Sequence, residues 1–152
     1  MTKNPHGVII AIDAMGGDHA PGVNIRGALA ALKEDPDLRI VLVGRRERLM
    51  EDLKIYNLAE SDRLSILHAD EVISMEDHAA IAMRKKKQSS IHLGLQEVKG
   101  GRAGAFISAG NSGAVMTGAL MVLGRLPHVD RPAIVIKIPS AEGYVILLDA
   151  GT

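Results

Sequence analysis

Polar residues follow apolar runs at several places in this chain, and two of these groups of polar residues could bind an anion. In the first group, Asp13 comes after the apolar run 8–12 and is followed by Gly16, Gly17 and Asp18. Glycines at such a turn let a backbone approach a ligand closely, and the start of the next helix attracts negative charge. The tract predicts one wall of a ligand site. A plain strand-to-helix connection capped by Asp18 accounts for it equally well.

The second group is the sequence SAGNSG, which begins at Ser108. Ser108 and Asn111 offer side-chain hydrogen bonds, while Gly110 and Gly113 permit close approach of a ligand. The first amides of the following helix, which opens at Ser112, could bind an oxyanion. The structural alternative is that Asn111 or Ser112 caps that helix while the glycines pack tightly.

A third candidate is the basic run RKKK at residues 84–87, which includes Lys86 and Lys87. One or two of these cations could reach a phosphate or an acidic partner. Four cations at the end of a helix also satisfy its negative end and stay solvated, which is the structural alternative. The chain has no cysteine, and its histidines lack paired metal-ligand spacing, so we expect no metal site.

Composition excludes several classes of protein. The 152 residues carry 18 basic and 18 acidic side chains, and this balance argues against broad electrostatic binding of nucleic acid. No P-loop or dinucleotide fingerprint is present. The uncharged stretch 103–124 is long enough to cross a bilayer, but glycine and polar residues interrupt its middle, which argues against a membrane helix.

The elements that position these residues alternate between strand and helix. Pro21 should open the first helix, and a break near Ser89 should divide the third helical region. Such alternation predicts one α/β domain, residues 1–152, with a mainly parallel sheet whose carboxyl edge binds the ligand. The last two strands, joined by PSAEG, should form a hairpin. Strands are expected at 8–12, 39–43, 65–67, 105–107, 133–138 and 144–148, and later helices at 45–55, 76–98 and 112–123.

Several blocks in order resemble the bacterial phosphate acyltransferases of fatty acid and phospholipid synthesis, the PlsX family. The blocks are IAIDAMGGDHAP, VISMEDHAAIAMRKKKQSSI, AFISAGNSGAVMTGAL, LGRLPHVDRPAI and VILLDAGT. The resemblance implies a three-layer α/β/α sandwich like that of the isocitrate and isopropylmalate dehydrogenases and the phosphotransacetylases. It also implies transfer of a fatty acyl group from acyl carrier protein to inorganic phosphate. Family members need no metal or organic cofactor and act as cytoplasmic homodimers that touch the membrane surface.

The implied chemistry assigns roles to the residues above. Phosphate attacks a thioester carbonyl, so the site must hold an anion beside a developing oxyanion. Backbone amides and neutral donors of the two glycine tracts suit this task, helped by Lys86, Lys87 or Arg131. Asp13 and Asp18 are expected to orient donors, because a carboxylate would repel phosphate.

Members of the resembled family are longer than this chain, so the resemblance implies that these residues form the N-terminal portion of the family fold. Two other functions stay open. One is a short-chain phosphotransacetylase-like enzyme that uses coenzyme A, and the other is a non-catalytic homologue that acts as a binding module.

Overall fold

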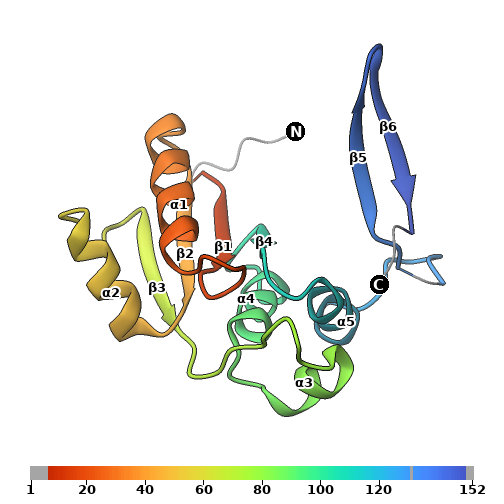
Figure 1. Ribbon diagram of the computed structural model, residues 1–152, viewed down its shortest axis with the longest axis horizontal. Helices are drawn as coiled ribbons and strands as arrows, with labels where there is room; N and C mark the ends of the chain where they lie inside the picture. Colours follow the sequence, from red (N-terminus) through yellow and green to blue (C-terminus); the bar gives the residue numbers. More distant parts are fainter. Residues whose placement is uncertain (1–6, 131, 150–152) are drawn as a thin grey trace.

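The computed structural model describes residues 7–130 and 132–149, and a four-stranded parallel sheet organises most of them (Figure 1). The strand order is β3-β2-β1-β4. This arrangement confirms the predicted mainly parallel sheet. Its strands are β1 (Ile9–Asp13), β2 (Arg39–Gly44), β3 (Leu64–His68) and β4 (Ala105–Ile107). The helices are α1 (Gly22–Glu34), α2 (Arg46–Ile55), α3 (Ala79–Lys85), α4 (Ser90–Lys99) and α5 (Ser112–Val122).

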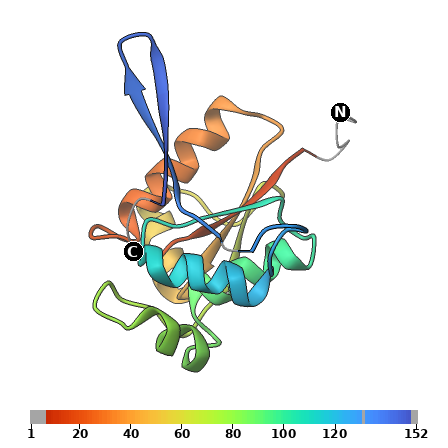
Figure 2. The same cartoon turned by 90° about the vertical axis from the view of Figure 1, so that its right-hand side faces the viewer.

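Helices cover both faces of the sheet, as continuous apolar strands require. Alternate side chains of β1 point to opposite faces, so Ile10 and Ile12 pack with α1 and α2 while Ile9 and Ala11 pack on the α4 side. Helices α3 and α5 pack against each other, and α5 also packs on α4 (Figure 2). The result is helix, sheet, helix, which confirms the layered α/β architecture.

The long helical region predicted between residues 76 and 98 is two helices, broken where expected. Ser89 takes an extended conformation between α3 and α4, and its Oγ accepts a hydrogen bond from the backbone N–H of His92. A serine in this position caps the new helix. The start of the first helix differs slightly from the prediction, since Pro21 occupies the cap position and Gly22 is the first helical residue.

The last two strands, β5 (Val135–Ser140) and β6 (Gly143–Leu148), form the predicted antiparallel hairpin. It extends away from the parallel sheet (Figure 1), and all of its residues are exposed. The expected end of the first strand before Pro139 is wrong, because β5 runs through this residue to Ser140. The hairpin has free edges, where a proline without an N–H donor is tolerated.

None of the helices within residues 7–130 and 132–149 has both the length and the apolar character needed to cross a bilayer.

His92 on α4 gives a prediction for the pH dependence of folding. The imidazole is buried, and burial together with the nearby charge of Lys87 lowers its pKa below the ordinary value of 6.5. As pH falls through 6.5, the unfolded chain binds a proton that folded His92 resists, so the free energy of unfolding decreases until the lowered pKa is reached. We expect His92→Gln to remove this component. The exposed His78→Gln is the matched control.

The measurement is urea unfolding of wild type and both variants between pH 8 and pH 5. The wild type and His78→Gln should lose stability over this interval more steeply than His92→Gln. Parallel curves for all three proteins would show that His92 makes no such contribution.

Candidate functional site

The carboxyl ends of β1 and β4 meet at one edge of the sheet and bring the two glycine tracts together. Register pairs Ile12 with Ile107, so the residues that follow them, Asp13 and Ser108, are neighbours. Ser108 Oγ donates a hydrogen bond of 2.7 Å to Asp13 Oδ2 across 95 residues of sequence. Asp13 is 2% exposed, and its other oxygen accepts from the backbone N–H of Met15 at 3.1 Å. The carboxylate therefore fixes two loops relative to each other.

Glycines make this contact possible because the two loops touch through their backbones. A Cβ on Gly16 would lie 2.5 Å from Asp13 Oδ2 and 2.7 Å from the Gly110 nitrogen. Gly17 has a φ of 98°, a left-handed conformation that favours glycine. Gly110 N–H donates to Ser108 Oγ at 3.1 Å, which closes the second loop. In this structure the predicted glycines serve the packing of one loop on the other.

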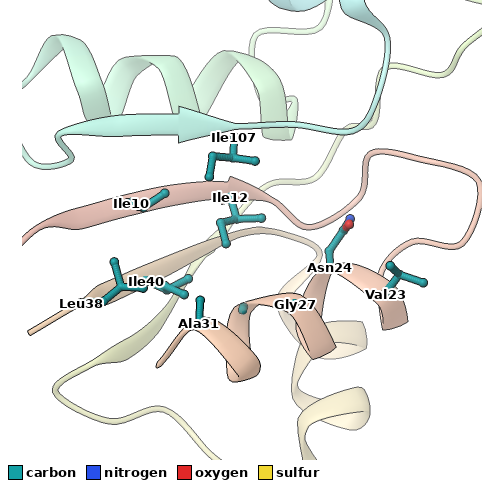
Figure 3. Close-up of a pocket in the computed structure, with 10 residues that line it drawn as sticks. Ile10, Ile12, Val23, Asn24, Gly27, Ala31, Leu38, Ile40 and Ile107 are labelled. Carbon is teal, nitrogen blue, oxygen red and sulfur yellow. The ribbon is translucent and has the colours of Figure 1, made fainter. Parts of the chain in front are cut away.

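Asn24, on the first turns of α1, is a site residue that the sequence analysis did not single out. Its side chain points from the helix toward the loop after β1 (Figure 3). Asn24 Nδ2 lies within hydrogen-bond distance of three carbonyl oxygens, those of Asp13 at 3.2 Å, Ala14 at 3.1 Å and Gly16 at 2.8 Å. An asparagine near the buried helix positions Ile25 and Ala28 was the available signal.

We expect Asn24→Ala to destabilise the protein by about 1–3 kcal/mol, because three loop carbonyls lose their side-chain donor. Asn24→Asp should cost more, since a carboxylate of the same shape would face the carbonyl oxygens without hydrogens to donate. Arg26→Ala, at an exposed position of the same helix, is the control. Urea unfolding of the three variants gives the measurement, and equal midpoints for Asn24→Asp and Arg26→Ala would contradict the role of Asn24.

Asn111 is the N-cap of α5, which is the structural alternative that the sequence left open. Its Oδ1 accepts from Ala114 N–H at 2.9 Å. Its Nδ2 donates to the carbonyl oxygens of Ser74 at 3.0 Å and Asp77 at 3.1 Å. The buried amide thus holds the start of α5 and ties it to the loop that precedes α3.

The basic run divides between two structural roles. Arg84 and Lys85 lie in the last turn of α3, as the solvated-end alternative expected. Lys86 Nζ donates to Asp77 Oδ2 and to the carbonyl oxygen of Val72, and this ammonium group, followed by the Ser74 N–H, holds the pKa of Asp77 below its ordinary value. A chain of contacts therefore joins Lys86 through Asp77 to the cap of α5.

The remaining predicted residues lie at the surface of this edge or outside the described ranges. Lys87 and Asp18 are exposed, and Asp18 does not cap α1, whose cap position is Pro21. Ser112 is exposed at the first position of α5. Gly113 follows it and packs toward α3, where an added Cβ would meet Ala79 at 3.3 Å. Arg131 lies outside the residues that the structure describes.

A groove of about 350 Å³ opens beside this edge along α5. Ser108, Gly110 and Ser112 line one part of it, and apolar side chains of α5 and residues 132–134 line the rest. The first two amides of α5 have no intrahelical acceptor, and α5 has no acidic residue in its first turn. Polar groups at the positive end of a helix, beside an open groove, suit an anion with an apolar substituent.

A different groove, of about 340 Å³, lies between α1 and the sheet (Figure 3). Its walls are apolar, with Ile12 and Ile107 on the strands and Ala31 on the helix. Asn24 lies at one end, but its amide is already used by the loop carbonyls. This groove therefore offers little to a charged group.

The chain is thus an α/β protein with two loops at the carboxyl edge of a parallel sheet and a helix N-terminus beside them, which is where proteins of this class commonly bind ligands. The family model of the fatty acid synthesis proteins matches residues 8–152. The chain belongs to this family.

Curated relatives from several bacteria carry the name phosphate acyltransferase. The protein of Halothermothrix orenii is 49% identical over 142 residues, which are 93% of this chain and 42% of the relative. A relative from Anaeromyxobacter sp. is 48% identical over 93% of this chain and 39% of its own length. One from Alkalilimnicola ehrlichii is 48% identical over 95% and 42%. The chain thus spans about 40% of the length of these relatives.

Proposed function

We propose that this chain contributes to a phosphate acyltransferase that moves a fatty acyl group from acyl carrier protein to inorganic phosphate. The observation that carries the proposal is the junction of the two strand-end loops beside the open N-terminus of α5, within a chain of this family. Phosphate is a small dianion, and helix amides bind such groups without a metal ion.

The reaction needs no nucleophile from the protein. A phosphate oxygen attacks the thioester carbonyl carbon, a C–O bond forms, and the C–S bond breaks as the thiolate leaves. A thiol with an ordinary pKa of about 8.5 is a good leaving group, so assistance from an acid is optional. The protein has to hold the two reactants together and stabilise the oxyanion.

The contacts suggest how these tasks are divided. The backbone amides of Ser112 and Gly113, with the Ser112 hydroxyl, are placed to bind phosphate or the oxyanion at the positive end of α5. Asp13, Ser108 and Asn111 act as positioning residues, because their polar atoms already bond to neighbouring loops. Asp18 and Lys87, which are exposed, stay proposals as contacts to the substrates. Arg131, which lies outside the described residues, stays a proposal as well.

The test is phosphate-dependent loss of the thioester of acyl carrier protein, with the acyl phosphate trapped as a hydroxamate by hydroxylamine. The chain is assayed beside the full-length relative of Halothermothrix orenii. Turnover with acetyl-coenzyme A in place of acyl carrier protein would favour the short-chain alternative. A folded chain that binds phosphate or carrier protein without turnover would favour the binding-module alternative.

Ser112→Glu separates phosphate binding from folding. A carboxylate in the first turn of α5 is favourable to the helix dipole, so the unfolding free energy should stay the same or rise by roughly 0.3–1 kcal/mol. The same charge repels phosphate, and we expect its affinity to fall by at least about tenfold. Ser112→Gln is the uncharged control of matched size. Unchanged phosphate affinity in Ser112→Glu, measured by calorimetry, would contradict this placement of the anion.

The cellular setting follows from the resemblance and is proposed with it. We propose a single α/β domain over residues 1–152 that works as part of a cytoplasmic homodimer with peripheral membrane contact. Sedimentation and flotation with anionic vesicles test the dimer and the membrane contact separately.

A further inference from the structure

The α5 groove changes character along its length. Ser112, Val115, Met116 and Ala119 follow one another at the spacing of a single helical stripe, and all of them line the groove. The stripe begins with a hydroxyl and continues with apolar side chains. Residues 132–134 form the opposite wall. From Ser112 to Ala119 the helix rises roughly 10 Å.

A second groove, of about 410 Å³, continues the first. The two share Ala119, Pro132 and Ala133, so the apolar path does not stop at the end of the stripe. The second groove is lined by Leu120 and Leu126, whose side chains are well exposed. Exposed apolar side chains gathered along a groove favour an apolar ligand.

We propose that the groove along α5 binds the hydrocarbon chain of a long-chain acyl group, with the reacting carbonyl at Ser108 and Ser112 and the chain running past Met116 to Ala119 and beyond. This inference rests on the proposed function, because it places the acyl half of that substrate. The order of polarity supports it, since the groove is polar where the phosphate amides lie and apolar further along.

The groove beneath α1 (Figure 3) lacks this order. Its polar end is Asn24, whose amide hydrogens are taken by carbonyls, whereas the α5 groove begins at free helix amides. Ala119 is the helix residue that lines both grooves. It lies where the two grooves meet, so its side-chain size should decide how long a chain fits.

The test uses butyl-, octyl- and dodecylphosphonate, which are stable anions with apolar chains of increasing length. Full burial of a methylene is worth about fourfold in affinity, and an open groove buries roughly half of it, so we expect about twofold per methylene. From butyl to dodecyl the affinity of the wild type should therefore rise by about 200-fold.

In Ala119→Phe the rise from butyl to dodecyl should shrink to below about tenfold, while butylphosphonate binds as before, because the phenyl ring blocks the path only at the far end of the stripe. Ala30→Phe, on the exposed face of α1, is the matched control and should behave as wild type. Leu120→Glu serves if Ala119→Phe does not fold, and it should weaken dodecylphosphonate alone. The same length dependence in the groove variants and the wild type overturns the proposal.

Assays with acyl carrier protein separate this inference from the proposed function. Turnover that is equally fast with butanoyl and dodecanoyl thioesters would overturn the groove assignment and leave the acyltransferase in place. Absence of turnover at every chain length would overturn the function, and the phosphonate titrations would then still decide the groove.

Discussion

Gly16→Ala should lower the free energy of unfolding by about 3 kcal/mol, because the added methyl group has no space between the two strand-end loops. Its Cβ would meet Asp13 Oδ2 at 2.5 Å and the backbone nitrogen of Gly110 at 2.7 Å. One of these atoms belongs to the main chain and the other to a carboxylate held by Ser108, so neither moves cheaply. We also expect phosphate-dependent turnover to fall by more than about 100-fold, since a shift of roughly 1 Å at a reacting centre has such effects.

Gly27→Ala is the matched control for this substitution. Gly27 lies on α1, and an added Cβ there would meet no atom within 4 Å. The same chemical change should raise the unfolding free energy by roughly 0.5–1 kcal/mol, because alanine favours a helix interior over glycine. Urea unfolding of both variants provides the comparison. If the stability lost in Gly16→Ala is no larger than the stability gained in Gly27→Ala, the two loops can move apart at little cost and their contact is unimportant.

Asn111→Ala should have the second largest effect, because one side chain makes two kinds of contact. Loss of the α5 cap costs about 1 kcal/mol. Loss of the hydrogen bonds to the carbonyls of Ser74 and Asp77 adds roughly 1–3 kcal/mol, since Asn111 is buried. The freed start of α5 should also reduce turnover at least about tenfold, because the proposed phosphate amides begin at the next residue.

Ser89→Ala is the control that removes a helix cap alone, whereas Asn111→Ala removes a cap and the contact of α5 with the loop before α3. Ser89 caps α4 through His92 N–H, and its hydroxyl donates only to the nearby carbonyl of Lys86. This variant should lose about 1 kcal/mol of stability and keep its activity. Hydrogen exchange adds a direct readout, since residues 74–77 should become less protected in Asn111→Ala alone. If both variants change stability and activity alike, the tether between α5 and the loop has no separate role.

The architecture could be predicted because local patterns and tertiary packing agree. Continuous apolar runs predicted strands that are covered on both faces, and β1, β2 and β4 appear within one or two residues of their expected bounds. The break at Ser89 was readable because serine caps helices. The extent of β5 was misjudged, because a strand can continue through a proline at a free edge, where no N–H donor is needed. The start of the third helical region was placed three residues too early, since α3 begins at Ala79.

For the candidate site, the sequence predicted several of the residues but not the hydrogen bonds between them. The sequence placed Asp13 and Ser108 at strand ends, yet their hydrogen bond depends on the register between β1 and β4. Asn24 was missed because its place near the buried positions of α1 is a weak signal, and its partners are backbone carbonyls, which no side-chain pattern identifies. Lys86 was singled out as part of a basic run. Its pairing with Asp77 could not be predicted, because it depends on how the loop folds back onto the end of α3.

The exposed hairpin also bears on how the purified chain behaves in solution. Its second strand carries the uninterrupted apolar run YVILL, and each of these side chains is open to solvent. Such a run resembles segments that stack between molecules, and a net charge of zero at pH 7 supplies no repulsion to keep copies apart. Colloidal stability should therefore be lowest near neutral pH. Light scattering should increase with concentration there and diminish a pH unit or two away.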